Sequence, residues 1–349
     1  MTKEKKKESN YLDDIKKTFG KDSIMSLSDM ELRPLETFPT GSYGIDEAVG
    51  NNGLPKGKII EVAGQESTCK TSLTLMMIAE VQKQGGKAAF IDAEHGFNAA
   101  HARKLGIQEK NFYLSLPMKG EEALTITQKL VESAEFDLIV VDSVPMIVPE
   151  KELEGDMGDA HYALNARLMG QAMRKLVALA SESGTTIIFI NQLRMNIDPM
   201  SRKKWIRPGG KALDFATTII MDLRRISDIK RGDEIIGINV KCKIEKNKVA
   251  PPKRETIIEF YFDEGISKSS ELINRALELK ILKAKGAGWF HLDDTRKFQG
   301  RDNLRLLLND DKELFKEIQT LINKKLKDKD EKTSDPVDKI DTVKKPKKK

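Results

Sequence analysis

Lys70 and Thr71 follow a short polar loop that begins at Gly64. An apolar β-branched run, IIEVAG, precedes this loop and a helical pattern follows it, so the sequence predicts a strand, a phosphate-binding loop and a helix. In such a loop the backbone N–H groups surround the phosphates of a nucleotide, the lysine reaches the β- and γ-phosphates, and the threonine hydroxyl binds Mg²⁺. Cys69 occupies the position where the usual pattern has a second glycine. The predicted nucleotide contacts are Gly64, Gln65, Glu66, Ser67, Thr68, Cys69, Lys70, Thr71 and Ser72.

Three more polar residues, Glu94, Asp142 and Gln192, each end an apolar run. In a parallel sheet the carboxyl ends of the strands meet at one edge, where ligands bind. Glu94 would orient or deprotonate the water that attacks the γ-phosphate, Asp142 would join the Mg²⁺ shell, and the Gln192 amide would bond the γ-phosphate or that water. Taken singly, a carboxylate after a strand is often a helix N-cap, and a glutamine there is often only a surface residue. Together with the loop, the three predict a nucleotide site.

The elements that position these residues are indicated by apolar runs that alternate with helical periods from Thr40 to about Gly265. Continuous β-branched runs separated by helices predict an α/β core with a mostly parallel sheet covered on both faces. Two later runs, INVKCKIEKNK and ETIIEFYFDEG, alternate more and have no helix between them, which indicates an antiparallel hairpin. The predicted domains are an N-terminal arm at 1–33, a core at 34–268, a small α/β domain at 269–326 and a disordered basic tail at 327–349.

Within the arm, Tyr11, Ile15 and Phe19 recur at helical spacing and predict a short amphipathic helix after a charged, disordered start at residues 1–10. Its apolar stripe would pack on the core of the same chain or on another subunit. The pattern favours neither of these two interpretations.

The net charge of the chain is concentrated at its C-terminal end. The formal net charge is +6, but eleven lysines and six acidic residues lie from Lys324 onward, which leaves 49 basic and 48 acidic residues in the rest. That part is nearly neutral, so any nucleic-acid contact must come from a local cluster. Two cysteines, Cys69 and Cys242, give no disulfide framework, and no apolar run reaches the roughly 18 residues that a membrane span takes. We expect a cytoplasmic protein that does not enter a membrane.

A local basic cluster directly follows Gln192. The stretch LRMNIDPMSRKKWIRPGGK contains two prolines, a Gly-Gly pair and no core periodicity, and loops of that length in a compact domain are usually functional or disordered. Its basic residues surround Trp205 and Met200, which suits phosphate neutralisation combined with contacts to unstacked bases. A merely solvated charged loop is the alternative, but the attachment to Gln192 favours coupling between nucleotide state and DNA binding. The segment from Glu152 to Ala163 is a second polar loop that we expect at the same face.

These residues resemble those of the bacterial RecA recombinase family, from about Tyr11 to Leu326. The segments FGKDSIM, FIDAEH, VVDSV, EGDMGD, FINQLRM and KNKVAPP are similar to RecA signatures and come at matching intervals. The resemblance implies a RecA-type P-loop core with an N-terminal helical arm and a small C-terminal α/β domain. It also implies an ATP-dependent DNA recombinase that forms helical filaments on single-stranded DNA. Such a protein catalyses homologous pairing and strand exchange, with DNA-stimulated ATP hydrolysis, in recombinational repair of DNA damage. The implied cofactors and partners are ATP and Mg²⁺, single-stranded and duplex DNA, further copies of the chain and an SOS-type repressor.

Position by position, the resemblance implies roles around the nucleotide. Lys70, Glu94 and Gln192 are implied to be catalytic, with Glu94 as the base and Gln192 as a switch. Thr71 and Asp142 would hold Mg²⁺, the aspartate through water.

The resemblance also implies roles farther from the loop. Lys246 and Lys248 match a catalytic pair that reaches the γ-phosphate bound by the neighbouring protomer. His101 stands where the family stacks a tyrosine on adenine. The implied DNA contacts are Gly155, Met157, Arg167, Arg174, Arg194, Met200, Arg202, Lys203, Lys204, Trp205, Arg207, Gly209 and Gly210.

The chain departs from the family pattern at several positions. Cys69, at a helix N-terminus beside a lysine, is expected to have a lowered thiol pKa and to make ATP use weaker or redox-sensitive. Ser201 replaces a phenylalanine that the family uses at DNA. The tail is basic where the familiar one is acidic, so deleting residues 327–349 is expected to weaken DNA binding most at low salt. A non-hydrolysing RecA-like DNA-binding filament or mediator, and a hexameric helicase on the same core, are the alternative functions.

Overall fold

The computed structural model describes residues 2–21, 23–26, 35–156, 164–196, 200, 204–286 and 288–333. The chain divides into two units, Met1–Glu36 and Thr37–Lys349. The first unit contains helix α1 (Thr2–Phe19), which begins well before the predicted start at Tyr11. Lysine and glutamate are good helix formers, so the charged segment before Tyr11 continues the helix.

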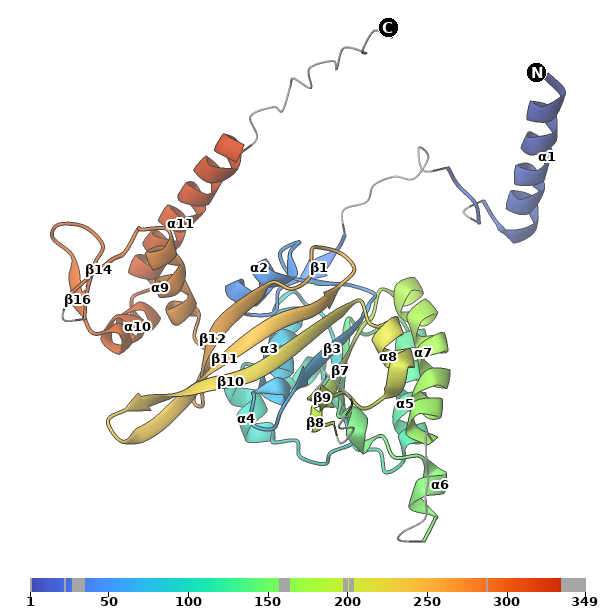
Figure 1. Ribbon diagram of the computed structural model, residues 1–349, viewed down its shortest axis with the longest axis horizontal. Helices are drawn as coiled ribbons and strands as arrows, with labels where there is room; N and C mark the ends of the chain where they lie inside the picture. Colours follow the sequence, from blue (N-terminus) through green and yellow to red (C-terminus); the bar gives the residue numbers. More distant parts are fainter. Residues whose placement is uncertain are drawn as a thin grey trace, which may run out of the picture. The chain divides into compact units, whose positions relative to one another are not determined.

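The second unit is built on a sheet that has nine strands within the described residues, in the order β13-β12-β11-β10-β3-β7-β6-β4-β5. Strands β10, β3, β7, β6, β4 and β5 are parallel, and β11, β12 and β13 extend the sheet in antiparallel fashion (Figure 1). This confirms the mostly parallel sheet and the antiparallel hairpin that the sequence predicts. The bounds are β3 Ile59–Gly64, β4 Ala88–Asp92, β5 Phe112–Ser115, β6 Leu138–Asp142, β7 Thr186–Gln192, β10 Ile219–Arg231, β11 Glu234–Asn247, β12 Glu255–Tyr261 and β13 Gly265–Ile266.

Successive residues of the parallel strands point into two different core clusters. Ile60 and Val62 of β3 pack in one cluster with α2 (Tyr43–Val49), α3 (Lys70–Lys83) and α4 (Ala99–Lys104). Ile59 packs in the other, with α5 (Gly120–Glu132), α7 (Leu164–Ser183) and α8 (Gly210–Ala216). Because both faces are covered, the strands have the continuous apolar composition seen in the sequence.

Short elements connect these layers. They are β1 Thr37–Phe38, β2 Leu54–Pro55, α6 Glu150–Leu153, β8 Arg194–Met195, β9 Trp205–Ile206, and the 3-10 turns Glu109–Asn111 and Val144–Met146. Strand β8 pairs with β9 in antiparallel fashion, so an early and a late segment of the basic stretch after Gln192 lie side by side as a small hairpin.

The C-terminal part has its own core, formed by leucine and isoleucine side chains of its helices. Its elements are α9 Lys268–Glu278, β14 Lys283–Lys285, β15 Trp289–His291, β16 Lys297–Gln299, α10 Arg301–Asp310 and α11 Lys312–Thr333. The three strands form one antiparallel sheet, as expected for a small α/β domain. Helix α11 continues past Leu326, where the sequence analysis placed the domain end.

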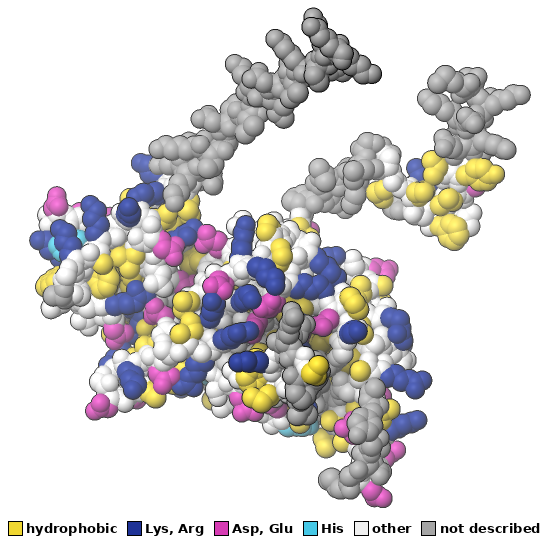
Figure 2. All heavy atoms as spheres, in the orientation of Figure 1, with side chains coloured by type: hydrophobic (Ala, Val, Ile, Leu, Met, Phe, Trp, Pro, Cys, Tyr) yellow, Lys and Arg dark blue, Asp and Glu magenta, His cyan; other side chains and the backbone are white. Residues whose placement is uncertain are grey.

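The surface of the second unit carries charges of both signs. Lys and Arg side chains lie over the visible face of the core, with Asp and Glu side chains between them (Figure 2). This pattern agrees with the nearly neutral composition outside the C-terminal end, and it leaves DNA recognition to local groups.

Candidate active site

A cavity of about 250 Å³ lies at the carboxyl ends of β3, β4, β6 and β7. All ten residues that line it are among the predicted nucleotide and catalytic residues. They are Glu66, Ser67, Thr68, Cys69, Lys70, Thr71, Ser72, Glu94, Asp142 and Gln192. The fold therefore brings the four strand ends together, as the sequence predicts.

The phosphate loop is tightly folded between β3 and α3. A Cβ atom at Gly64 would lie 2.6 Å from Thr68 Oγ1 and 2.7 Å from the Leu223 carbonyl oxygen, so a side chain does not fit there. Ser67 and Cys69 both have φ of 56°, a left-handed conformation that turns the backbone toward the helix. Helix α3 starts directly after the loop, and its first N–H groups are available to an anion.

Lys70 extends back across this loop. Its side chain is largely buried, and Nζ donates a hydrogen bond of 2.6 Å to the Gln65 carbonyl oxygen. Burial lowers the pKa of Lys70, while the nearby carboxylates of Asp142 and Glu94 act in the opposite direction. The ammonium group is thus held where it can exchange a carbonyl oxygen for a phosphate oxygen.

Thr71 and Asp142 form a hydroxyl–carboxylate pair. Thr71 Oγ1 donates to Asp142 Oδ2 at 2.7 Å. Burial raises the pKa of Asp142 to about 7, the bond from Thr71 lowers it, and the charge of Glu94 raises it. The second oxygen, Asp142 Oδ1, is buried without a hydrogen-bond partner among the described residues. A buried carboxylate oxygen with no partner, next to a threonine hydroxyl, fits a hard cation such as Mg²⁺ and its water shell.

Glu94 and Gln192 touch across the sheet. Gln192 Nε2 donates a hydrogen bond of 3.1 Å to Glu94 Oε1. Their strands, β7 and β4, lie on either side of β6. The backbone N–H groups of Ala93 and Glu94 donate to the Asp142 carbonyl oxygen, at 2.7 and 3.1 Å, which ties the end of β4 to β6.

Cys69 does not have the lowered pKa that the sequence analysis predicts. Burial raises the pKa of its thiol to about 12, and the positive charge of Lys70 offsets this only in part. The side chain is half-buried against the core cluster on the α3 side of the sheet. The expectation of a lowered thiol pKa is wrong because the loss of solvation outweighs the neighbouring cation.

His101, the predicted adenine platform, lies beside the loop helix. It belongs to α4, and its Nε2 lies 2.9 Å from Ser72 Oγ. The α4 N-cap Asn98 accepts a hydrogen bond from the His101 backbone N–H at 3.0 Å and fixes the start of this helix. Contact with a base stays a prediction.

Lys246 and Lys248 lie away from the cavity and reach the end of α8. Lys248 Nζ donates to the Phe215 carbonyl oxygen at 2.8 Å, and Lys246 Nζ donates to that of Asp214. Burial and the charge of Lys248 lower the pKa of Lys246. Both lysines thus contact the negative end of a helix, and neither lines the cavity among the residues that the structure describes.

The predicted DNA-binding residues are only partly within the described chain. Met157, Arg202 and Lys203 lie outside the described residues, as does Ser201. Among the predicted DNA contacts that the structure describes, the exposed side chains are those of Arg167 and Arg174 on α7, and of Arg194, Met200, Lys204 and Trp205 around the β8–β9 hairpin. Gly155 is half-buried after α6.

Gly209 and Gly210 join the loop to α8. Their φ angles are 94° and 74°, a region that favours glycine. A Cβ at Gly209 would lie 2.9 Å from Val144 Cγ1, and one at Gly210 would lie 3.0 Å from Ala166 Cβ. The pair is therefore required by the chain reversal and the close packing at this point, in addition to any contact with DNA.

Two polar residues of the paired strands β3 and β7, Glu61 and Asn191, are not among the residues that the sequence predicts. Glu61 of β3 is fully buried and accepts a hydrogen bond of 2.8 Å from Asn191 Nδ2. Arg207 Nε lies 3.4 Å from Glu61 Oε1, and Arg207 Nη2 donates to Asp214 Oδ1 at 2.6 Å. The signal that points to this cluster is an acidic residue inside the apolar run IIEVAG.

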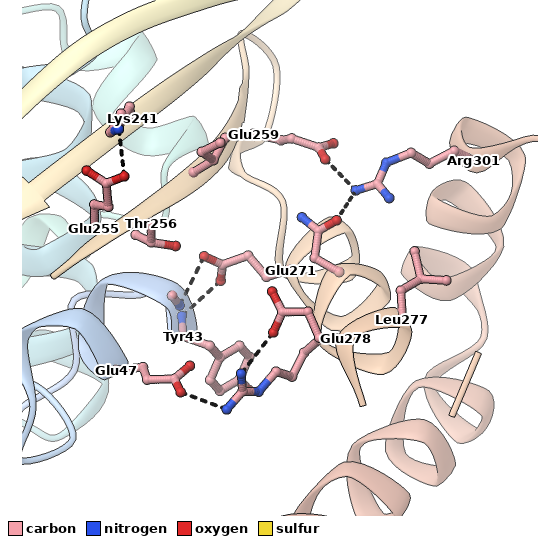
Figure 3. A pocket seen from close by; sticks show the side chains of 14 residues that line it. Tyr43, Glu47, Lys241, Glu255, Thr256, Glu259, Glu271, Leu277, Glu278 and Arg301 are labelled. Carbon is pink, nitrogen blue, oxygen red and sulfur yellow. Dashed lines mark hydrogen bonds and ion pairs between the residues drawn. The ribbon is translucent and has the colours of Figure 1, made fainter. Parts of the chain in front are cut away.

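A larger cavity, of about 660 Å³, lies between the core and the C-terminal helices (Figure 3). Ion pairs line its rim, including Arg275 with Glu47 at 2.7 Å. Glu271 of α9 accepts hydrogen bonds from Ser42 Oγ and from the Tyr43 backbone N–H at 2.9 Å, so it caps the start of α2. This carboxylate joins the two parts of the unit and belongs to none of the predicted sites.

Residues 6–267 match the RecA N-terminal domain, and residues 270–327 match the RecA C-terminal domain. The chain belongs to the RecA family. Protein RecA of Legionella pneumophila (strain Corby) is 45% identical over 322 residues, which cover 92% of each chain. Protein RecA of Campylobacter fetus subsp. fetus (strain 82-40) is 46% identical over 308 residues, covering 88% of this chain and 89% of the relative. Protein RecA of Chloroherpeton thalassium is 46% identical over 324 residues, covering 93% and 90%.

Membership of the RecA family confirms the predicted fold class and function. The chain is a RecA recombinase and a DNA-dependent ATPase, and filament formation with strand exchange is typical of this family. The family implies ATP binding with magnesium, DNA binding and assembly of copies of the chain. Within the described ranges, no helix has the length and apolar character needed to cross a bilayer.

Proposed function

We propose that the cavity formed by the phosphate loop, Glu94, Asp142 and Gln192 binds and hydrolyses ATP, and that its state sets how the basic loop holds single-stranded DNA. The hydrogen bond between Gln192 and Glu94 supports this proposal most directly. It joins the residue from which the basic loop departs to the residue that we assign as the base. A change at either residue therefore reaches the other.

We assign Lys70 and Thr71 to the triphosphate and its metal. A phosphate oxygen would replace the Gln65 carbonyl oxygen as acceptor for Lys70 Nζ, because a charged acceptor makes the stronger hydrogen bond. Thr71 Oγ1 and Asp142 Oδ1 would hold Mg²⁺, the carboxylate through water. Magnesium supplies charge neutralisation to the phosphates when it is bound.

We assign Glu94 as the general base. Its exposed carboxylate lies just past the end of β4, beside the strand that carries Asp142. It would take a proton from the attacking water, and the Gln192 amide would fix the orientation of the carboxylate. His101 is assigned to the adenine ring, held beside the loop helix by Ser72.

We assign Lys246 and Lys248 to the nucleotide of the neighbouring protomer. Two cations that reach the γ-phosphate from the next copy would make hydrolysis depend on filament assembly. Helix α8 begins at Gly210, where the basic loop ends, and its last carbonyl oxygens bind both lysines. The helix would therefore connect the DNA loop with the two cations.

We assign the basic loop to single-stranded DNA. Exposed Arg194 and Lys204 would neutralise phosphates, and Trp205 with Met200 would contact unstacked bases. The other assigned contacts are Gly155, Met157, Arg167, Arg174, Arg202, Lys203, Gly209 and Gly210. On the family resemblance we also assign duplex DNA and an SOS-type repressor as partners of the filament, and the cytoplasm as its location.

ATP hydrolysis with and without single-stranded DNA, measured beside joint-molecule formation, tests this function. We expect DNA to stimulate hydrolysis by the parent protein and joint molecules to form. Glu94→Gln should still bind nucleotide but lose about a hundredfold or more of its turnover, the usual contribution of a general base. DNA binding without any hydrolysis would support the non-hydrolysing filament or mediator, and stimulated hydrolysis without joint molecules would support the helicase.

A further inference from the structure

Glu61 is an acidic residue in the middle of the buried strand β3. Burial raises the pKa of its carboxyl group to about 6, while the charge of Arg207 and the hydrogen bond from Asn191 act in the opposite direction. Asn191 Nδ2 donates to Glu61 Oε1 at 2.8 Å, and Arg207 Nε lies 3.4 Å from the same oxygen. A carboxylate at this depth is costly to keep ionised unless it is paired, so Arg207 is the partner that Glu61 requires.

The two partners of Glu61 also hold the end of the basic loop. Asn191 Nδ2 donates to the Pro208 carbonyl oxygen at 2.8 Å. Arg207 Nη2 donates to Asp214 Oδ1 of α8 at 2.6 Å. The loop therefore returns to the core at Arg207 and Pro208, where it is fixed to β3, β7 and α8 together. Asn191 directly precedes Gln192, so this attachment lies next to the start of the loop as well.

Arg207 differs from the other described basic residues of the loop in its solvent exposure and in its ion pairs. Its side chain is 25% exposed and is paired with two carboxylates, whereas Arg194 and Lys204 are exposed. If Arg207 turned to a DNA phosphate, it would leave a buried carboxylate without its counter-charge, which is strongly unfavourable.

We propose that Arg207 is a positioning residue that pairs with Glu61 to fix the return arm of the basic loop, and that it does not itself neutralise a DNA phosphate. The arm so fixed carries Lys204 and Trp205, which face the solvent. This inference rests on the proposed DNA-binding function of the loop, and it revises the DNA contact that the sequence analysis predicts for Arg207.

The salt dependence of single-stranded DNA binding tests the proposal. Each lost phosphate contact reduces the slope of log K against log salt concentration by about 0.7 for single strands. We expect Arg207→Gln to weaken DNA binding about tenfold relative to the parent at the same salt concentration, because the ion pair with Glu61 that positions the loop is lost. The slope should stay unchanged, because no phosphate contact is lost. Lys204→Gln, the matched control, should reduce the slope. Glu61→Gln should weaken binding as Arg207→Gln does, and the double variant should be no weaker than the weaker single variant.

Trp205 gives a second readout that needs no DNA. The chain has two tryptophans, so Trp289→Phe leaves Trp205 as the only reporter. In DNA-free protein, Arg207→Gln should increase acrylamide quenching of Trp205 fluorescence about twofold, because a released loop opens locally. Arg207→Lys keeps a cation beside Glu61, so acrylamide should quench Trp205 fluorescence in this variant to the same extent as in the parent. If Glu61→Gln fails to fold, as melting and nucleotide binding would show, the two Arg207 variants still decide the result.

A slope reduced equally in Arg207→Gln and Lys204→Gln would show a phosphate contact and overturn the positioning role. Unchanged quenching of Trp205 in Arg207→Gln would overturn it as well. If Lys204→Gln and Arg194→Gln both left DNA affinity and slope unchanged, the DNA function of the loop would fail instead, and Trp205 quenching would still decide whether Arg207 fixes the loop.

Discussion

Gln192 Nε2 donates a hydrogen bond of 3.1 Å to Glu94 Oε1 across the strand that carries Asp142. Gln192 is also the last residue of β7 before the basic loop. The proposed base and the first fixed point of the proposed DNA loop are therefore in direct contact. DNA that moves the loop would change the orientation of the Glu94 carboxylate, and a nucleotide that draws Glu94 away would release Gln192.

Replacing Gln192 should separate ATP binding from its control by DNA. We expect Gln192→Ala to bind nucleotide within about threefold of the parent but to lose about tenfold or more of the DNA-stimulated turnover, because one coupled contact is removed. Steady-state hydrolysis at saturating single-stranded DNA, beside nucleotide affinity, measures this. Arg194→Gln is the control, since it should raise the DNA concentration needed and keep the maximal rate. Full stimulation of Gln192→Ala at saturating DNA would contradict the coupling.

The thiol of Cys69 should be inert at neutral pH. With a pKa of about 12 it holds very little thiolate, which is the reactive form. We expect iodoacetamide to modify Cys69 at least about a hundredfold more slowly than it modifies the unfolded chain. A Cys242→Ala background leaves Cys69 as the only thiol for this measurement. Peroxide should leave ATP hydrolysis unchanged, and rapid inactivation that Cys69→Gly abolishes would refute this expectation.

The sequence predicts the cavity well because its residues end continuous apolar runs. Asp142 and Gln192 are the last residues of buried strands and Glu94 lies just past the end of another, and a parallel sheet must bring such strand ends to one edge. The partners of these residues are set by tertiary contacts, which the sequence does not display. The bond from Gln192 to Glu94 crosses an intervening strand, and no local pattern indicates it.

Other features escape the sequence for different physical reasons. Strand β5 has half-buried and exposed residues at the sheet edge, and its apolar run, Phe-Tyr-Leu, is shorter than those of the central strands. Glu61 has the opposite character, an acid in an apolar run, which is visible in the sequence but has no evident partner there. The direction of the pKa shift of the Cys69 thiol is predicted wrongly because desolvation depends on packing that only the fold supplies.

Glu271 should make the stability of the protein fall as the pH rises through the range from about 4.5 to 7. Its pKa is raised from 4.5 to about 7, mainly by burial. In this range the folded protein keeps a proton that the unfolded chain releases, so raising the pH favours unfolding. Glu271→Gln removes this penalty and can still bond the backbone of Tyr43. We expect it to gain up to about 3 kcal/mol in unfolding free energy, relative to the parent, between pH 4.5 and pH 8.

Thermal unfolding of both proteins across this pH range measures the difference. Glu278→Gln, an exposed position on the same helix, is the control for loss of one negative charge. A difference between Glu271→Gln and the parent that stays constant with pH would show that the Glu271 carboxyl group does not titrate in this range.

In the proposed mechanism, ATP is held by the phosphate loop of one copy and by Lys246 and Lys248 of the next, so that assembly on DNA completes the site. Mixing two inactive variants tests it most directly. Lys70→Ala removes the loop lysine, and the double variant Lys246→Ala/Lys248→Ala removes the pair that acts on the neighbour. Each alone should show no DNA-stimulated hydrolysis.

In an equal mixture, about a quarter of the head-to-tail junctions would combine an intact loop with an intact lysine pair. DNA-stimulated hydrolysis should therefore return to about a quarter of the parent rate. An equal mixture that stays as inactive as either variant, although both variants enter the same filaments, would contradict a site shared between copies.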